Sequence, residues 1–420
     1  MNMHGEIIAT GTELISGRVA DTNSRYAAAR LHDAGLIVQR ITLLGDEVAR
    51  FQETLRQGLK GSQFIIITGG LGPTEDDITV AAAAEVLQIP LRLDDYLLKR
   101  IKECLAKRGL PWEERYARLA LVPEGAVILD PGGAACGFYL RYDQAWLYFL
   151  PGVPEQMQML FDSFVLPPLL SLASGGQCVC QRTLRLFGLT ETQLESLINQ
   201  ICQDNSEVSV GLYPNFPENH LSLTIRGPRS QVLEKTLDRL TEELAQAAGE
   251  ALLGVDDVTL EELVGRGLRA HHLTIAVAES CSGGLISHRL TNIPGSSDYF
   301  MGGVVTYSNQ AKMELLQVPP EVLDRYGAVS AETAEAMVVG AKNLFHTPVA
   351  LAATGIAGPG GGSAEKPVGT VYLGLAMSER VQTQKYMFHG SREQIKTLTA
   401  QTALDWLRRE LHNDTCLSGH

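Results

Sequence analysis

The chain has 420 residues, of which 45% are hydrophobic and 20% are charged, a composition typical of a globular protein with two or three domains. Its net charge of −13 at pH 7, without any run of Lys and Arg, argues against a surface that binds nucleic acid directly. No apolar run approaches the roughly 20 residues that span a bilayer, so we expect no membrane partner.

The amino-terminal sequence and the cysteines indicate the compartment. The opening, MNMHGEIIATGTEL, has neither the basic start nor the long apolar core of a signal peptide. The seven cysteines are odd in number and show no paired metal-ligand spacing, with only a C-x-C at 178–180. We therefore expect free thiols and a cytoplasmic protein.

The first domain, predicted at 1–170, alternates strands with helices. Strands are expected at 6–10, 36–44 and 64–68 and helices at 22–32, 47–60 and up to Val86, before a strand, a Pro-Gly turn and a helix in 145–161. This alternation predicts an α/β fold with a parallel sheet and helices on both faces.

Two further domains are predicted after a Ser/Gly linker at 171–177. Residues 171–252 contain helical patterns at 190–203 and 229–248 between short strand patterns, which indicates a small α+β unit. The third domain, 253–415, is again α/β, and the tail LHNDTCLSGH is expected to fray.

Three segments of the third domain contain the residues with chemical potential. They read AVAESCSGG (276–284), TYSNQAK (306–312) and ATGIAGPGGGSAEKPVGT (353–370). The first predicts a strand, a turn and a helix start, whose free N–H groups could hold an oxyanion if Ser280 attacked a carbonyl. A partly buried Lys312 could lose its proton and act as the base. The Gly-rich third segment suggests a phosphate cradle.

Other interpretations of the first segment stay open at this point. Serine and glycine are ordinary turn formers. Cys281 is a stronger nucleophile than serine, although a cysteine beside a strand end is more often a small buried hydrophobe. The residues alone do not choose among Ser280, Cys281 and Ser282.

A second candidate site follows the predicted strand at 64–68, where the sequence reads GGLGPTEDDIT (69–79). Its glycines let backbone N–H groups approach an anion. Thr74 as a helix cap, with acids in the first helical turn, is enough to explain the polar residues. The alternative is a divalent metal between phosphates, to which Glu13 in the loop 11–23 would contribute.

The three carboxy-terminal segments together resemble the C-terminal domain of the CinA family, a nicotinamide mononucleotide deamidase. The resemblance implies that Ser280 is the nucleophile of a metal-free amidohydrolase, with Tyr307 and Lys312 as its catalytic partners. Ser282 stands where many members have threonine. The resemblance further implies that the substrate, a nucleotide of pyridine nucleotide recycling, contacts a set of residues around the loop 355–362: Gly283, Gly284, Thr354, Gly355, Gly358, Gly360 and Arg392.

The amino-terminal motifs, including LPGVPEQM (150–157), are similar to the N-terminal domain of CinA, which shares the three-layer molybdopterin-binding fold of MoaB and MogA. The similarity implies an ADP-ribose pyrophosphatase that uses a divalent cation, with Asp76 and Asp77 as metal ligands. The implied site residues are Glu13, Asp46, Gly69, Gly70, Gly72, Asp76 and Asp77. A molybdopterin-like ligand is the alternative for this domain.

These observations give one leading hypothesis and two competitors. The leading hypothesis is a deamidase that also cleaves ADP-ribose, with small nucleotides as ligands and a homodimer as the assembly. The first competitor is a phosphoanhydride hydrolase with a degenerate third domain. The second is a non-enzymatic protein of DNA uptake or damage, which the acidic charge disfavours.

Overall fold

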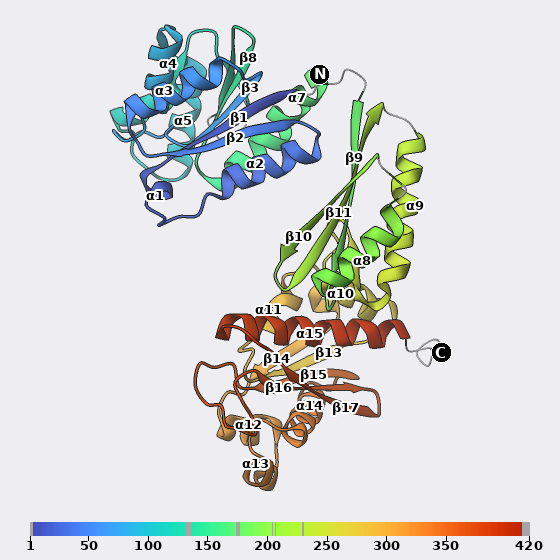
Figure 1. Ribbon diagram of the computed structural model, residues 1–420. Coiled ribbons are helices and arrows are strands. Elements are labelled where there is room, and N and C mark those ends of the chain that lie inside the picture. The colour runs from blue at the N-terminus through green and yellow to red at the C-terminus, as the bar shows by residue number, and fades with distance from the viewer. Residues whose placement is uncertain are drawn as a thin grey trace. The chain divides into compact units, whose positions relative to one another are not determined.

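The computed structural model describes residues 3–130, 137–173, 177–203, 205, 207–228 and 231–413. It divides the chain into two compact units, Met1–Gln181 with Ile225–Lys235, and Arg182–Thr224 with Thr236–His420 (Figure 1). The predicted linker at 171–177 lies partly outside the described residues, as does most of the tail.

The first unit is built on a six-stranded sheet in the order β2-β1-β3-β8-β7-β6. The first four of these strands are parallel and the last two are antiparallel: β2 (Ile37–Leu44), β1 (His4–Thr10), β3 (Phe64–Thr68), β8 (Ala145–Leu150), β7 (Phe138–Tyr142) and β6 (Val127–Ile128). A separate ribbon pairs β4 (Leu91–Leu93) with β5 (Leu121–Pro123).

Helices cover both faces of this sheet, so the predicted three-layer fold is confirmed. Along β3, Ile65 and Ile67 pack into one buried core and Phe64 and Ile66 into the other, because successive side chains of a strand point to opposite faces. The helices are α1 (Thr12–Ile15), α2 (Thr22–Asp33), α3 (Val48–Leu59), α4 (Thr79–Leu87), α5 (Asp95–Lys107), the 3₁₀ helix η1 (Glu114–Ala120), α6 (Pro154–Leu160), the π-helix η2 (Phe161–Val165) and α7 (Leu166–Ala173).

The middle of the chain forms a four-stranded sheet with two helices, as the small α+β prediction requires. The strand order is β10-β11-β9-β12. The elements are β9 (Gln177–Leu186), α8 (Glu191–Cys202), β10 (Val208–Asn215), β11 (Glu218–Pro228), α9 (Gln231–Ala248), the 3₁₀ helix η3 (Gly249–Ala251) and β12 (Leu252–Val255).

The carboxy-terminal sheet has the order β14-β13-β15-β16-β17. Its first three strands are parallel and its last two antiparallel: β14 (Phe300–Val305), β13 (Ile275–Glu279), β15 (Val349–Gly355), β16 (Thr370–Met377) and β17 (Arg380–Met387). Every residue of β13 is buried, since helices cover both faces of this central strand.

Two helix layers enclose this sheet, and Figure 1 shows α15 lying along one face and α14 along the other. One layer holds α10 (Leu260–Ala270), α11 (Leu285–Thr291) and α15 (Arg392–Asn413), and the other holds α12 (Asn309–Leu316), α13 (Pro320–Tyr326) and α14 (Ala331–Phe345). The short 3₁₀ helix η4 (Ser296–Asp298) precedes β14. Within the described residues, no helix is long and apolar enough to cross a membrane.

Candidate functional sites

Ser280 and Lys312 meet at the carboxyl ends of the parallel strands of the carboxy-terminal sheet. Ser280 directly follows β13, and its N–H group donates to the carbonyl oxygen of Ala353 on β15 at 2.9 Å. Lys312 lies on α12, and its Nζ donates to the Ser280 hydroxyl oxygen at 3.1 Å. The carboxyl ends of parallel strands are the usual position of a site in an α/β domain.

The environment of Lys312 suits a base. The side chain is 1% exposed, and its Nζ also donates to the carbonyl oxygen of Thr306 at 2.7 Å. Burial lowers the pKa of the Lys312 amine below its ordinary value, because the charged form is poorly solvated there. Sequence reasoning missed Thr306, whose contribution is a backbone carbonyl that any residue type would supply.

All three candidate nucleophiles are buried, with Ser280 at 8% exposed, so their contacts and not their exposure separate them. Cys281 is 5% exposed and belongs to the hydrophobic core, and its burial raises the pKa of the thiol to about 12. The Ser282 side chain is fully buried and its hydroxyl has no hydrogen-bond partner in the described part of the chain. Ser280 is the one of the three whose hydroxyl contacts the amine of Lys312.

The prediction that the start of α11 supplies an oxyanion hole is wrong for two of its N–H groups. The carboxylate of Glu279, which is fully buried, accepts from the N–H groups of Ile286 at 3.1 Å and Ser287 at 2.9 Å. These donors are therefore used inside the protein. Glu279 stabilises the short helix instead, in the way that a carboxylate favours a helix amino terminus.

Tyr307 lies at the mouth of the site. Its side chain is 63% exposed, and its hydroxyl accepts from Arg392 Nη2 at 2.8 Å. Arg392 Nη1 donates to the carbonyl oxygen of Gly358 at 2.6 Å, which joins the Gly-rich loop to α15. Among the described contacts Lys312 Nζ bonds to Ser280 and Thr306, and Tyr307 bonds to Arg392 and not to the lysine, so a catalytic role for Tyr307 stays a prediction.

The remaining predicted substrate residues surround the same region. Thr354 is 1% exposed at the end of β15, next to Ala353, and its hydroxyl donates to the carbonyl oxygen of Ala328 at 2.6 Å. Gly284 is the residue before α11, and Gly355 ends β15. Gly360 has open space where a side chain would stand.

Lys396 is a residue of this site that sequence reasoning missed. Its Nζ lies 3.4 Å from the position that a Cβ would take at Gly283. No hydrogen bond or ion pair of Lys396 is found within the described ranges. Lys396 follows Arg392 by one helical turn, so one face of α15 presents two cations to the nucleophile turn and the Gly-rich loop. The four-residue spacing in the sequence was the available signal.

The predicted amino-terminal site residues come together in one cleft of about 900 Å³. All seven line it, at the carboxyl ends of β1, β2 and β3: Glu13, Asp46, Gly69, Gly70, Gly72, Asp76 and Asp77. Gly70 has φ +65°, and a Cβ there would lie 2.1 Å from Thr79 Oγ1, so this position requires glycine.

Two threonine–aspartate pairs shape the cleft. Thr12 donates from its N–H and its hydroxyl to Asp46 Oδ2 at 3.0 and 2.7 Å, and Thr74 does the same to Asp77 Oδ2 at 2.8 and 2.6 Å. The interpretation of Thr74 as a helix cap is wrong, because α4 begins only at Thr79. The acidic segment is a turn held by its own carboxylate.

The carboxylates of the cleft could bind a divalent cation together with the phosphates of a substrate, but they do not form a complete metal site in the described part of the chain. Within the described residues, no three His, Cys, Asp or Glu side chains lie together as a ready metal site. The lining carboxylates, including Glu13 and Asp76, are oxygen donors of the kind that Mg²⁺ prefers. Mg²⁺ commonly binds through one or two carboxylates and the phosphates of its substrate, and these residues fit that arrangement.

Comparison with known protein families agrees with the fold. Residues 6–171 match a probable molybdopterin binding domain, 181–254 the damage-inducible protein CinA KH domain, and 257–411 the CinA C-terminal domain. The CinA-like protein of Geotalea uraniireducens is 40% identical over 405 residues, which are 96% of both chains. That of Desulfotalea psychrophila is 39% identical over 410 residues, or 97% of this chain and 99% of the relative.

The crystal structure of the competence/damage inducible protein CihA from Agrobacterium tumefaciens is 43% identical over 37% of this chain and 96% of its own, with a TM-score of 0.35. The fold and the matches define a multidomain α/β protein that joins a molybdopterin-binding fold to a second α/β domain. The chain belongs to the CinA family, as the sequence motifs predicted.

Proposed function

We propose that the carboxy-terminal domain is an amidohydrolase that converts nicotinamide mononucleotide and water to nicotinate mononucleotide and ammonia. The hydrogen bond from buried Lys312 to the Ser280 hydroxyl is the main support. A serine needs a base to become a good nucleophile, and a lysine whose pKa is lowered by burial can provide one. The family resemblance supplies the identity of the substrate.

The proposed reaction has two stages. The neutral amine of Lys312 takes the proton of Ser280 as Oγ attacks the carboxamide carbon, and the tetrahedral intermediate then expels ammonia, which receives that proton from Lys312. Water next attacks the resulting ester and gives its proton to Lys312. Oγ leaves and regains this proton, which releases the nicotinate nucleotide.

The cations at the mouth of the site support a phosphorylated substrate. Arg392 and Lys396 extend from one face of α15 toward the Gly-rich loop and the nucleophile turn. Guanidinium and ammonium groups bind phosphate well, and the binding energy of a remote phosphate can position the reacting carboxamide. In this proposal Tyr307, held by Arg392, lies beside the bound nucleotide.

Ammonia release tests the proposal directly. The full chain should release ammonia from nicotinamide mononucleotide and very little from nicotinamide, while Ser280→Ala should lose at least about 10³-fold in kcat. Thr291→Ala, a hydroxyl change at the far end of α11, is the matched control and should keep activity. No ammonia from the nucleotide, or equal kcat/KM for both compounds, would contradict the proposal.

A second activity is proposed for the amino-terminal cleft, namely cleavage of ADP-ribose to AMP and ribose 5-phosphate. The gathering of all seven predicted residues around one cleft supports it. The backbone at Gly69, Gly70 and Gly72 would receive the phosphates, and Asp76, Asp77, Asp46 and Glu13 would hold a divalent cation. Such a cation, when bound, neutralises phosphate charge. AMP release with and without Mg²⁺ is the test.

Direct nucleic-acid binding by the middle domain is not favoured, although a KH model matches it. KH domains clamp nucleic-acid backbones with a GxxG loop. Residues 181–254 contain no GxxG, and they have ten acidic residues against six Lys and Arg.

A further inference from the structure

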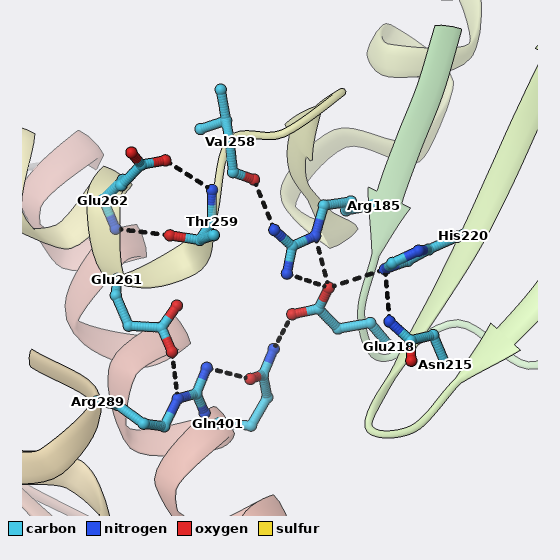
Figure 2. Close-up of polar contacts among 10 residues, drawn as sticks. All are labelled: Arg185, Asn215, Glu218, His220, Val258, Thr259, Glu261, Glu262, Arg289 and Gln401. Carbon is cyan, nitrogen blue, oxygen red and sulfur yellow. Dashed lines mark hydrogen bonds and ion pairs between the residues drawn. The ribbon is translucent and has the colours of Figure 1, made fainter. Parts of the chain in front are cut away.

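A buried polar network connects the middle domain to the helices of the carboxy-terminal site (Figure 2). Its centre is Glu218, at the start of β11, which is 6% exposed. Arg185 of β9 donates to Glu218 Oε2 from Nε at 2.9 Å and from Nη2 at 2.8 Å. A buried carboxylate destabilises the fold unless its oxygens accept hydrogen bonds. The remaining partners of Glu218 therefore show which elements it connects.

Glu218 remains ionised despite its burial. Burial by itself raises the pKa of this carboxyl, but the hydrogen bond from His220 and the charge of Arg185 outweigh it and hold the pKa below its ordinary value. His220 Nε2 lies 3.4 Å from Glu218 Oε2. Glu218 therefore presents a charged oxygen to its partners in the carboxy-terminal domain.

Arg185 and Glu218 each make one contact with the carboxy-terminal domain. Arg185 Nη1 donates to the carbonyl oxygen of Val258 at 2.9 Å, just before α10. Glu218 Oε1 accepts from Gln401 Nε2 at 3.1 Å, and Gln401 is a fully buried residue of α15. These hydrogen bonds thus join the middle domain to the segment before α10 and to α15.

Gln401 extends the network to α11. Its Oε1 accepts from Arg289 Nη2 at 2.7 Å, and Arg289 also pairs with Glu261 of α10. The amide therefore donates to Glu218 and accepts from Arg289, so one side chain joins the middle domain to both α15 and α11 (Figure 2). Each of its two polar ends has a charged partner, which fixes its orientation.

The two helices joined in this way are those that flank the proposed nucleophile. α11 begins directly after the turn that follows Ser280, and α15 presents Arg392 and Lys396 to that turn and to the Gly-rich loop. At its other end α11 is held by Glu279, the residue before Ser280. A displacement of Arg289 would therefore act on a helix that is only seven residues long and is bonded to the neighbour of the nucleophile.

We propose that Glu218 is a positioning residue of the amidohydrolase site, which acts through Gln401 and Arg289 on α11 and α15. The proposal rests on the amidohydrolase function proposed above. It makes the middle domain a structural part of a site whose reacting residues all lie in another domain. A small displacement of the reacting groups can lower the reaction rate strongly. Loss of the hydrogen bond between Glu218 and Gln401 should therefore lower kcat.

The test uses the full-length chain with Glu218→Gln, Gln401→Met and the double variant. Each single variant should lower kcat for ammonia release by about tenfold or more, and the double variant should lose no more than the worse single one, because both break the same connection. The matched control is Glu243→Gln, which removes an exposed carboxylate paired with Arg239 in the same domain. It should keep wild-type kcat.

Hydrogen exchange gives a readout that does not need activity. Backbone exchange in a peptide covering 279–291 should rise about tenfold in Glu218→Gln, while a peptide from α14 (331–345) should not change. Unchanged exchange and kcat, a uniform rise in all peptides, or losses that multiply in the double variant would each overturn the positioning role. A wild-type chain that releases no ammonia would overturn the proposed function, and the exchange data would still decide the structural connection.

Discussion

Glu279 accepts two hydrogen bonds from Ser287, from its N–H group at 2.9 Å and from its hydroxyl at 2.7 Å. A third bond comes from the N–H group of Ile286. The carboxylate is fully buried, so a helix start that could have faced a ligand is instead closed by the residue before the nucleophile. Glu279 thereby couples the position of Ser280 to the stability of α11.

Removal of the Glu279 carboxylate should destabilise the folded protein. Glu279→Ala leaves the buried N–H group of Ile286 and the part-buried N–H and hydroxyl groups of Ser287 without this acceptor, and we expect a loss of about 3 kcal/mol or more in the free energy of unfolding. Glu279→Gln retains one acceptor oxygen and should lose roughly half as much. Urea unfolding measures both. The control Glu321→Ala, an exposed acid in the first turn of α13, should change stability by less than about 0.5 kcal/mol. Equal effects at the two positions would contradict the capping role.

The sequence predicted where the carboxy-terminal candidate site lies, but not which hydrogen bonds its residues make. The strand, turn and helix around Ser280 follow from an apolar run, glycines and a second apolar pattern, and the structure has them at nearly the predicted residues. The choice of Ser280 over Cys281 depends on which side chain faces the core. The alternation of inward and outward positions through a turn is not specified by residue type.

Hydrogen bonds to backbone carbonyl groups could not be predicted from the sequence either. Lys312 is oriented by the carbonyl of Thr306, and Arg392 by that of Gly358, and neither contact depends on a recognisable side chain. In the amino-terminal domain, the sequence TEDD (74–77) after a glycine loop is typical of a helix start. The helix begins several residues later because Asp77 binds back to Thr74 and closes a turn.

The nucleophile prediction has a chemical test. Cys281 is buried, and its pKa of about 12 leaves almost no thiolate at neutral pH, so iodoacetamide should not modify it in the folded protein. Cys281→Ala should cost about 1 kcal/mol of stability through lost packing while keeping most of the ammonia release. Mass spectrometry of alkylated peptides and a turnover assay check the two parts. Rapid alkylation at Cys281 that tracks loss of activity would move the nucleophile to the thiol.

The pH dependence of turnover should follow Lys312. The reaction needs the neutral amine, so kcat/KM should rise with pH and level off above the lowered pKa of Lys312, that is, below the ordinary 10.5. Lys312→Arg should be nearly inactive at every pH, because arginine does not deprotonate. An activity profile that falls as the pH rises toward the ordinary lysine pKa, or turnover by the arginine variant, would rule out the base role.

The same lysine should make stability depend on pH. Since its folded pKa lies below its unfolded pKa, the unfolded chain binds more protons between the two values, and stability rises with pH in that window. Below the folded pKa the burial cost is present in full. Lys312→Met lacks this dependence, so the stability of wild type relative to the variant should increase from pH 7 toward pH 10. Urea midpoints of both proteins at matched pH values measure the difference.

Lys396 should affect substrate binding more than chemistry. Its ammonium group lies at the nucleophile turn without a protein partner in the described ranges, so Lys396→Met should raise KM for nicotinamide mononucleotide about tenfold with little change in the melting temperature. Lys385→Met on β17, an exposed lysine of the same domain, is the control and should leave KM unchanged. The two variants should not differ on nicotinamide itself. A larger effect on kcat than on KM would assign Lys396 to the reacting end instead.

The activity of the amino-terminal cleft should be lost without any loss of activity at the carboxy-terminal site. Asp77→Ala removes a carboxylate that lines the cleft and binds Thr74, so metal-dependent AMP release from ADP-ribose should fall by at least about 10²-fold while ammonia release stays at the wild-type level. Glu75→Ala is the matched control, because Glu75 lies in the same turn but does not line the cleft. Gly70→Ala should also abolish AMP release, since its Cβ would collide with Thr79. If wild type releases no AMP with any of several divalent metals, the cleft binds a ligand without cleaving it, and Asp77→Ala should then weaken ADP-ribose binding in a calorimetric titration.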